Sequence, residues 1–508
     1  MGIAKRKGAN NRQHTLLSAL PGASMTVIKT VKIHPALGIA RIGNSPTQFF
    51  IGPELPGDRT VPNGGYKDGQ HRIKRQAARF RLFGYDASGR LVKELTARDG
   101  RITWTVHLAN KKAAWKNFDG LNSNAPLRNA GIPDRSGLSI DPGPRSITGI
   151  DKTAAFDTGA FLGIPVPLGE IRSDSHGRLI VLGGFGHSAS PSNAPITTFA
   201  NNDGWHDDVS DGPVTASIVL KGTSRRVKAA GAWVICAPPK FAPPLDNAIT
   251  LYDVLLQVAV DRLGLALPPQ PSYTSDIYPI LQRAIDMKWV SKMVSSAHAH
   301  HTCSILIPPP GSAADRIAVF ARLLSPVDGS GGDMPMIWSD NYPAAGNATL
   351  TRVQYMMMQR WRDGNFINDW IGVPKPSTDI TPEGLDRAAL EPCVGGAFHP
   401  GIEASWLLRD AYVFDEPFRL SHSGLDAGDV TKQMAVPWQA DFYDCSQEGA
   451  LAWWPAQRPD DVFVSGGESQ VSWTRELVGS QMGMVKKWHR LGFVVRKGSR
   501  YVETERKP

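Results

Sequence analysis

The chain has 508 residues, 41% of them hydrophobic and 20% charged, so it can bury a large core and is not expected to be disordered as a whole. By length alone it would hold roughly two to four domains, or one large domain with insertions. The formal net charge of +9 is spread along the chain without a long basic run, which argues against nucleic-acid binding.

The amino-terminal segment is basic, and its apolar stretch at residues 16–20 is shorter than the apolar core of a secretory signal peptide. We therefore expect residues 1–25 to form a disordered extension. Nowhere does the sequence approach the about 18 consecutive apolar residues that a transmembrane helix needs. It predicts a soluble protein, either cytoplasmic or exported without a recognisable signal peptide.

Residues 26–240 consist of short β-type runs between turn residues, and several of these runs alternate apolar and polar side chains as half-buried antiparallel strands do. We expect a mainly β, sandwich-like domain over this range. The predicted strands lie at 26–33, 78–85, 102–108, 179–182, 215–220 and 232–236.

After two proline pairs at 238–239 and 243–244, the hydrophobic period changes to helical spacing. Helices are predicted near 251–263, over 278–289 and over 350–362, and a last short strand is predicted at 492–496. We expect residues 241–508 to form a mixed, largely helical and loop-rich domain. The predicted fold class is α+β, with the candidate site in the second half.

Three features that suggest other functions have simpler interpretations. The four cysteines are too few for a disulfide framework. The cluster of His298, His300, His301 and Cys303 has no second pair with metal-ligand spacing, so no metal site is predicted. Residues 183–186 lack the third glycine and the following helix of a dinucleotide motif, so a turn between strands is favoured.

The most informative segment is 436–445, followed by 452–459, because it combines a carboxylate, a thiol and several indoles. Asp441 and Cys445 are four residues apart, so on a helix both side chains share one face. Asp444 is adjacent to Cys445 and points elsewhere on a helix. A thiol that must be oxidised needs a nearby base, so this pattern indicates a redox site.

These residues resemble the amino-acid oxidases that build a cysteine tryptophylquinone from their own side chains, the lysine ε-oxidase and glycine oxidase family. In that family an Asp lies four residues before the crosslinked Cys, and the partner Trp lies several tens of residues further on. Other long strings extend the resemblance to about residues 30–495; they are 33–44, 49–54, 76–81, 106–112, 201–213, 276–281 and 393–403.

The resemblance implies that Cys445 is crosslinked to a tryptophan further along the chain. The candidates are Trp453, Trp454, Trp473 and Trp488. We favour Trp488 because residues 484–493 are the most similar to the family's late Trp segment, which leaves Trp453 and Trp454 to pack beneath the cofactor in the pocket.

The resemblance also implies that Cys393 and His399 line the pocket or its channel. It implies oxidative deamination of an amine or amino acid: a primary amine forms a Schiff base with the quinone, and a carboxylate, here Asp441, takes the proton from the carbon that bears nitrogen. Burial against indole rings would make Asp441 a stronger proton acceptor. Reoxidation by O2 then releases hydrogen peroxide and ammonia.

A flavoprotein maturation partner is a further implication of the resemblance, and we expect a homo-oligomer. Two alternatives stay open. One is a quinone enzyme that acts on a peptide-bound amine or passes electrons to a protein acceptor, and the other is a quinone-free binding protein on the same fold. Which amine is the substrate depends on pocket loops that the sequence does not position.

Overall fold

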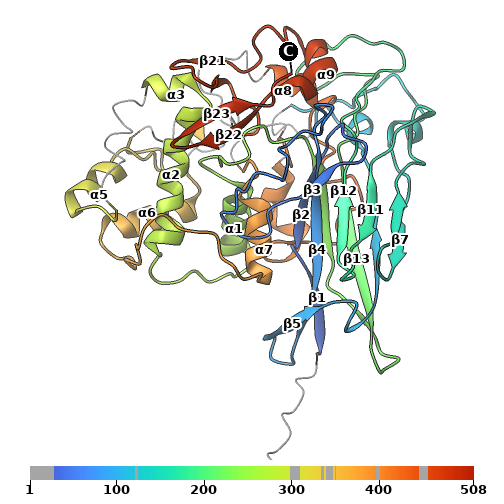
Figure 1. The fold of residues 1–508 in the computed structure, drawn as a ribbon, viewed down its shortest axis with the longest axis horizontal. Coiled ribbons are helices and arrows are strands. Elements are labelled where there is room, and N and C mark those ends of the chain that lie inside the picture. The colour runs from blue at the N-terminus through green and yellow to red at the C-terminus, as the bar shows by residue number, and fades with distance from the viewer. Residues whose placement is uncertain are drawn as a thin grey trace, which may run out of the picture.

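A computed structural model describes residues 28–119, 124–297, 309–332, 334, 337–338, 347–348, 350–395, 401–404, 406–444 and 456–507. Figure 1 shows a large sheet on one side of the molecule, most helices on the other, and the pair α8 and α9 beside the hairpin β22–β23 at the top. Within these ranges, no helix is both long and apolar enough to cross a membrane.

Thirteen strands from the described residues form one sheet, in the order β7-β6-β13-β15-β2-β4-β12-β11-β8, with β1, β3 and β5 on β4 and with β14 on β13. The end strands β7 and β8 contact each other, so the sheet is nearly closed. The strands are β1 (Thr30–His34), β2 (Leu37–Arg41), β3 (Phe49–Ile51), β4 (Arg75–Tyr85), β5 (Leu91–Leu95), β6 (Gly100–Val106), β7 (Arg145–Thr148), β8 (Thr153–Ala155), β11 (Glu170–Ser173), β12 (Leu179–Leu182), β13 (Ser210–Leu220), β14 (Arg226–Lys228) and β15 (Ala232–Ala237).

The sheet encloses a hydrophobic core that includes Phe80, Trp104 and Ile218, all of which are buried. Its pairs are antiparallel except β15 with β2 and β3 with β4, which are parallel. Strand β2 is buried at every position because its outer side is covered by helices, as expected for a strand inside an α/β packing.

The second half packs helices and small hairpins on the outer side of β2 and β15. Helix α1 (Leu251–Arg262) begins at Thr250, whose hydroxyl and the Asp253 carboxylate form a capping box. The other helices are α2 (Tyr278–Asp286), α3 (Lys292–Ala297), α5 (Ala313–Phe320), α6 (Arg352–Arg362), α7 (Pro382–Leu390), α8 (Trp438–Asp444) and α9 (Gln481–Lys487). The paired short strands of the second half are β16 (Ile337–Trp338) with β17 (Asn347–Ala348), β18 (Phe414–Glu416) with β19 (Arg419–Leu420), β20 (Asp461–Phe463) with β21 (Gln470–Ser472), and β22 (Phe493–Lys497) with β23 (Arg500–Thr504). A further pair, β9 (Ala160–Phe161) with β10 (Ile164–Pro165), lies in the first half.

The α+β fold class is confirmed, with a β amino-terminal region and a helical, loop-rich second half. Strand β12 coincides with the predicted 179–182. Strand β13 begins at Ser210, earlier than predicted, because pairing with β15 holds a stretch of low β propensity that includes Pro213. The division at residue 240 stays a prediction, and the expected extension 1–25 lies outside the described residues.

Asp211, at the start of β13, joins the sheet to the second half. Its carboxylate accepts hydrogen bonds from the Trp233 indole (2.9 Å) and from the Thr431 hydroxyl (2.6 Å) and backbone N–H (2.9 Å). The group is fully buried. A stretch some two hundred residues further along the chain is therefore fixed on the sheet by one side chain.

We expect Asp211→Ala to lower the free energy of unfolding by about 3 kcal/mol, because it leaves several buried donors without an acceptor. Denaturant titration measures this loss. As a control, Asp134→Ala removes an exposed carboxylate that bonds only within its own turn, and it should cost less than about 1 kcal/mol. Equal losses in the two variants would contradict the role of Asp211.

Burial raises the pKa of Asp211 to about 6. The folded state therefore binds a proton more tightly than the unfolded chain, whose Asp pKa is about 3.9, and this contribution to stability is lost as pH rises from about 4 through 6. Asp211→Asn has no such titration. As pH rises through this window, the Tm of the wild type should fall relative to the Tm of Asp211→Asn. A Tm difference that does not change with pH would refute the expectation.

Candidate functional site

Residues 438–444 form helix α8, so Asp441 lies on a helix as the predicted four-residue spacing requires. Pro437 stands directly before the helix, where its missing N–H costs nothing. Trp438 and Asp441 are both buried and lie three residues apart, on one face. Cys445, the residue after the end of α8 in the sequence, lies outside the described residues.

Trp488 follows α9 in a short 3-10 turn and is only 3% exposed. Its ring meets the edge of the Trp438 ring, with 5.4 Å between centroids and 72° between planes. At the other end of the helix pair, the Gln481 amide donates to the Asp444 carboxylate at 3.0 Å. Helices α8 and α9 therefore run antiparallel, and Trp488 packs on the α8 face that carries Trp438.

The start of α8 is held in place by a buried ion pair between Lys112 and Asp207. Lys112 Nζ lies 2.8 Å from Asp207 Oδ2, and neither side chain is exposed to solvent. The same carboxylate oxygen accepts the backbone N–H of Trp438 at 3.0 Å, while Lys112 also donates to the Ala435 carbonyl at 2.9 Å. The pair fixes both sides of the chain where α8 begins.

Asp208, next to Asp207, holds the backbone turn formed by residues 184–188, here called the 184–188 turn. Its Oδ2 accepts the N–H groups of Phe185 (2.6 Å) and His187 (3.0 Å). Burial raises the pKa of Asp208 to about 7. The carboxyl group is thus placed to bond backbone and not solvent.

The 184–188 turn is also bonded to α8 through Gln439. The Ser188 hydroxyl donates to Gln439 Oε1 at 2.7 Å, and Gln439 Nε2 donates to the Gly186 carbonyl at 3.4 Å. Gly186 lies against Trp488, since a Cβ atom at position 186 would lie 2.1 Å from Cζ2 of that indole. The turn, α8 and Trp488 therefore form one packed unit.

Two observations show that this unit fits a modified tryptophan at position 488. Because residue 186 is glycine, no Cβ atom stands against the benzene edge of Trp488, where it would lie 2.1 Å from Cζ2. In addition, the buried Trp438 Nε1 donor has no hydrogen-bond partner among the described residues, so it is available to an acceptor near the edge-to-face pair of indoles.

The other predicted site residues are distributed differently. Cys393 is buried, and its sulfur accepts from Arg41 and donates to the Ala389 carbonyl (3.4 Å). Burial raises the pKa of its thiol. It belongs to the cluster between β2, β15 and α1, although the neighbouring Val394 packs in the cluster of Trp488. Pocket residence for Cys393 stays a prediction.

The competing tryptophan Trp473 is also fully buried, but its surroundings differ from those of Trp488. Its indole N–H donates to the Gly492 carbonyl at 3.0 Å, and its ring packs on Phe241 with 4.8 Å between centroids. The predicted pocket residues His399, Trp453 and Trp454, like the His298–Cys303 cluster, lie outside the described residues. Both cysteines that the structure describes, Cys236 and Cys393, are free.

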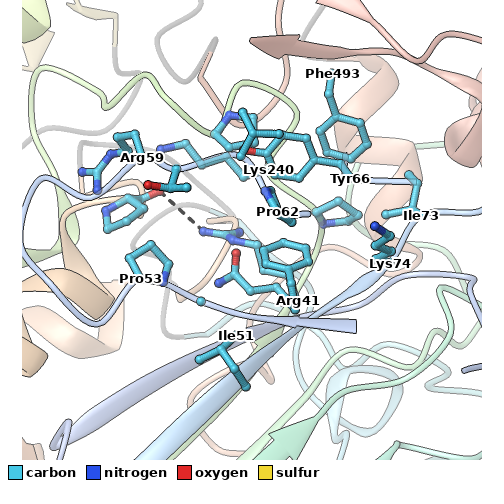
Figure 2. Close-up of a pocket in the computed structure, with 18 of the residues that line it drawn as sticks. Arg41, Ile51, Pro53, Arg59, Pro62, Tyr66, Ile73, Lys74, Lys240 and Phe493 are labelled. Atoms are coloured by element: carbon cyan, nitrogen blue, oxygen red, sulfur yellow. Dashed lines mark hydrogen bonds between the residues drawn. The ribbon is translucent and has the colours of Figure 1, made fainter. Parts of the chain in front are cut away.

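A cavity of about 280 Å³ opens between the sheet and the second half. Figure 2 shows that Arg41, Arg59 and Lys240 lie toward one end of it, and Tyr66, Ile73 and Phe493 toward the other. The rings of Phe493, Phe241, Phe442 and Trp438 follow one another between this cavity and Trp488. The cavity is therefore separated from Trp488 by aromatic packing.

Sequence reasoning missed Lys112, Asp207, Asp208 and Gly186 as site residues. In the sequence, the strings 106–112 and 201–213 only extend the family resemblance. The structure shows that they contact each other through the ion pair of Lys112 in one with Asp207 in the other. The signal available in the sequence was the concentration of four aspartates in 201–213 and of two lysines at the end of 106–112.

Two family models match separate parts of this chain. The L-lysine epsilon oxidase N-terminal family matches residues 34–236, and the L-lysine epsilon oxidase C-terminal domain family matches residues 329–473. L-lysine 6-oxidase from Marinomonas mediterranea is 29% identical over 529 aligned residues, which cover 82% of this chain and 71% of that protein.

Solved structures of the same enzyme share the fold. The structure of the epsilon-lysine oxidase from M. mediterranea matches with a TM-score of 0.78 at 25% identity, covering 94% of this chain and 95% of that one. A crystal structure described as the Schiff base intermediate of that enzyme with L-Lys gives a TM-score of 0.76 at 24% identity over the same shares of both chains. The resemblance seen in the sequence is confirmed, and the chain belongs to the L-lysine ε-oxidase family.

Proposed function

We propose that this protein is an amine oxidase that carries a cysteine tryptophylquinone made from Cys445 and Trp488. The family relationship supports an oxidoreductase that acts on an amine. The observation that carries the cofactor assignment is the packing of Trp488 on α8, on the face that Trp438 and Asp441 share. Cys445 follows Asp441 by four residues in the sequence, which is the spacing at which two side chains of a helix share one face.

The proposed substrate is the side-chain amine of lysine or a similar primary amine. Support comes from the relative, which is an L-lysine 6-oxidase, and from the structure of that enzyme with L-Lys. The overall change takes one amine, one O2 and one water to an aldehyde, ammonia and hydrogen peroxide. Two electrons leave the C–N unit of the amine and reduce O2 to the peroxide.

A quinone on Trp488 would supply the electrophilic carbonyl and the two-electron acceptor that the twenty amino acids lack. The protein's own part is to hold the amine, exclude water and move a proton. Asp441 is buried on α8 and is proposed to take the proton from the carbon that bears the nitrogen. Trp438 and Phe442, packed edge to face on the same helix, keep water away from it.

Asp444 is less suited to this role. Its carboxylate accepts both contacts of the Gln481 amide, at 3.0 and 3.1 Å, at the far end of α8 from Trp438. It therefore joins α8 to α9, while Asp441 is left as the carboxylate of α8 that lies one turn from Trp438. Two carboxylates three residues apart provide a matched pair for mutation.

Mature protein, made together with its native neighbouring genes so that a flavoprotein maturation partner is present, should carry a covalent link between Cys445 and Trp488. Intact mass should exceed that of the bare polypeptide by about 28 Da, for two oxygens gained and four hydrogens lost. Peptide mapping should find the two residues in one crosslinked product. A fully alkylatable Cys445 in that preparation, or a crosslink to Trp473, would contradict the assignment.

We expect Asp441→Asn to lower kcat by about 10³-fold, the usual range for loss of a general base. The visible quinone absorption should also be reduced, because the same carboxylate serves cofactor formation. Asp444→Asn should keep both the absorption and the peroxide production. Normal absorption and normal turnover in Asp441→Asn would transfer the role of base to another residue.

A further inference from the structure

We propose that the 184–188 turn is a positioning element for cofactor formation, in which Gly186 keeps the Cζ2–Cη2 edge of Trp488 open for the two quinone oxygens. The inference rests on the proposed function, since it takes Trp488 as the modified residue. It assigns a role to a glycine motif that the sequence alone indicated only as a turn between strands.

The backbone of Gly186 lies close to one edge of the Trp488 ring, the edge that includes Cζ2 and Cη2. A Cβ atom at position 186 would lie 2.1 Å from Cζ2, 2.7 Å from Cη2 and 3.0 Å from Cε2. Tryptophylquinone carries its two oxygens on Cζ2 and Cη2, and each oxygen projects about 1.2 Å from its carbon. A methyl group at position 186 would therefore compete with these oxygens for the same space.

Gly186 is also fixed in place, so the open space is maintained. Its φ of +75° lies in the left-handed region that glycine adopts readily. Asp208 bonds the N–H groups on both sides of it, from Phe185 and His187, and Gln439 bonds its carbonyl. The turn thus cannot drift toward or away from the indole without breaking bonds to two different elements.

Gly184 makes the close approach of Asp208 possible. A Cβ atom at position 184 would lie 2.4 Å from Asp208 Oδ2, the oxygen that accepts the backbone N–H groups. The two glycines therefore have separate tasks in one turn. Gly184 admits the carboxylate on one side, and Gly186 leaves room for the oxygenated ring edge on the other.

Formation of the quinone and of the thioether removes hydrogens from both Trp488 and Cys445. Two ring hydrogens of Trp488 are replaced by carbonyl oxygens, and the thioether bond replaces one further ring hydrogen and the thiol hydrogen of Cys445. The pair of side chains gains two oxygens and loses four hydrogens. With O2 as the oxidant, two molecules of O2 are consumed and two of water are released. The turn supplies no group to this reaction and acts only by shape.

The test compares Gly186→Ala with Gly222→Ala, each made with the native neighbouring genes. The two glycines have nearly the same φ, +75° and +76°, but a Cβ at position 222 would meet nothing within 4 Å. Backbone strain is therefore matched, and only the contact with Trp488 differs. Intact mass gives the modified fraction, visible absorption reports the quinone, and Tm reports folding.

We expect Gly222→Ala to be modified as fully as the wild type, and Gly186→Ala to show at least a tenfold lower modified fraction in folded protein. Full modification of folded Gly186→Ala would overturn the inference while the proposed function stands. A wild type that lacks the mass gain under the same conditions would remove both. The readouts are mass and absorption, so neither depends on turnover.

A second pair of variants decides the question if Gly186→Ala is not recovered as folded protein. Asp208→Asn changes no volume but replaces a carboxylate that bonds the turn, whereas Asp203→Asn alters a carboxylate that bonds the Asn129 backbone. The modified fraction should fall severalfold in Asp208→Asn and stay at the wild-type level in Asp203→Asn. Equal, full modification of both variants would refute a positioning role for the turn.

Discussion

The buried ion pair between Lys112 and Asp207 is the interaction on which the site depends. Both groups are fully shielded from solvent, so their desolvation must be offset by nearly complete bonding. Asn110, the Trp438 N–H and the Ala435 carbonyl provide it. Loss of either partner would leave a buried charge, at a cost of about 3–5 kcal/mol. The first turn of helix α8 therefore depends on both partners of the ion pair for its position.

Three carboxylates within five residues, Asp207, Asp208 and Asp211, join the sheet to the site through different hydrogen bonds. Asp207 stays close to an ammonium group, whereas Asp208 and Asp211 bond neutral donors, and burial raises their pKa values to about 7 and about 6. Each bonds a different partner: the start of α8, the 184–188 turn and Thr431. One short segment thus sets the relative positions of three parts of the chain, two of which, α8 and the 184–188 turn, pack against Trp488.

Local pattern accounts for what the sequence predicted well. Short apolar runs of β-forming residues located β12 and β15, and helical spacing located α1. The carboxylate Asp441 was correctly placed on a helix, which the structure describes as far as Asp444. Periodicity reports which side of one element is buried, but not which distant element covers it. The pairing of Lys112 with Asp207 and the contact of Gly186 with Trp488 join residues of distant elements, so only the fold reveals them.

The nearly closed sheet has a consequence for the order of assembly. All its thirteen strands come from residues 30–237, while the atoms that complete the bonding of Asp207 and Asp211 come from residues 430–438. During synthesis the sheet can form first, since domains fold as units from the amino terminus. Asp207 and Asp211 then receive their remaining hydrogen-bond donors when residues 430–438 pack against them. The segment that carries Trp488 is thus among the last parts of the chain to be enclosed, and it packs on a scaffold already built.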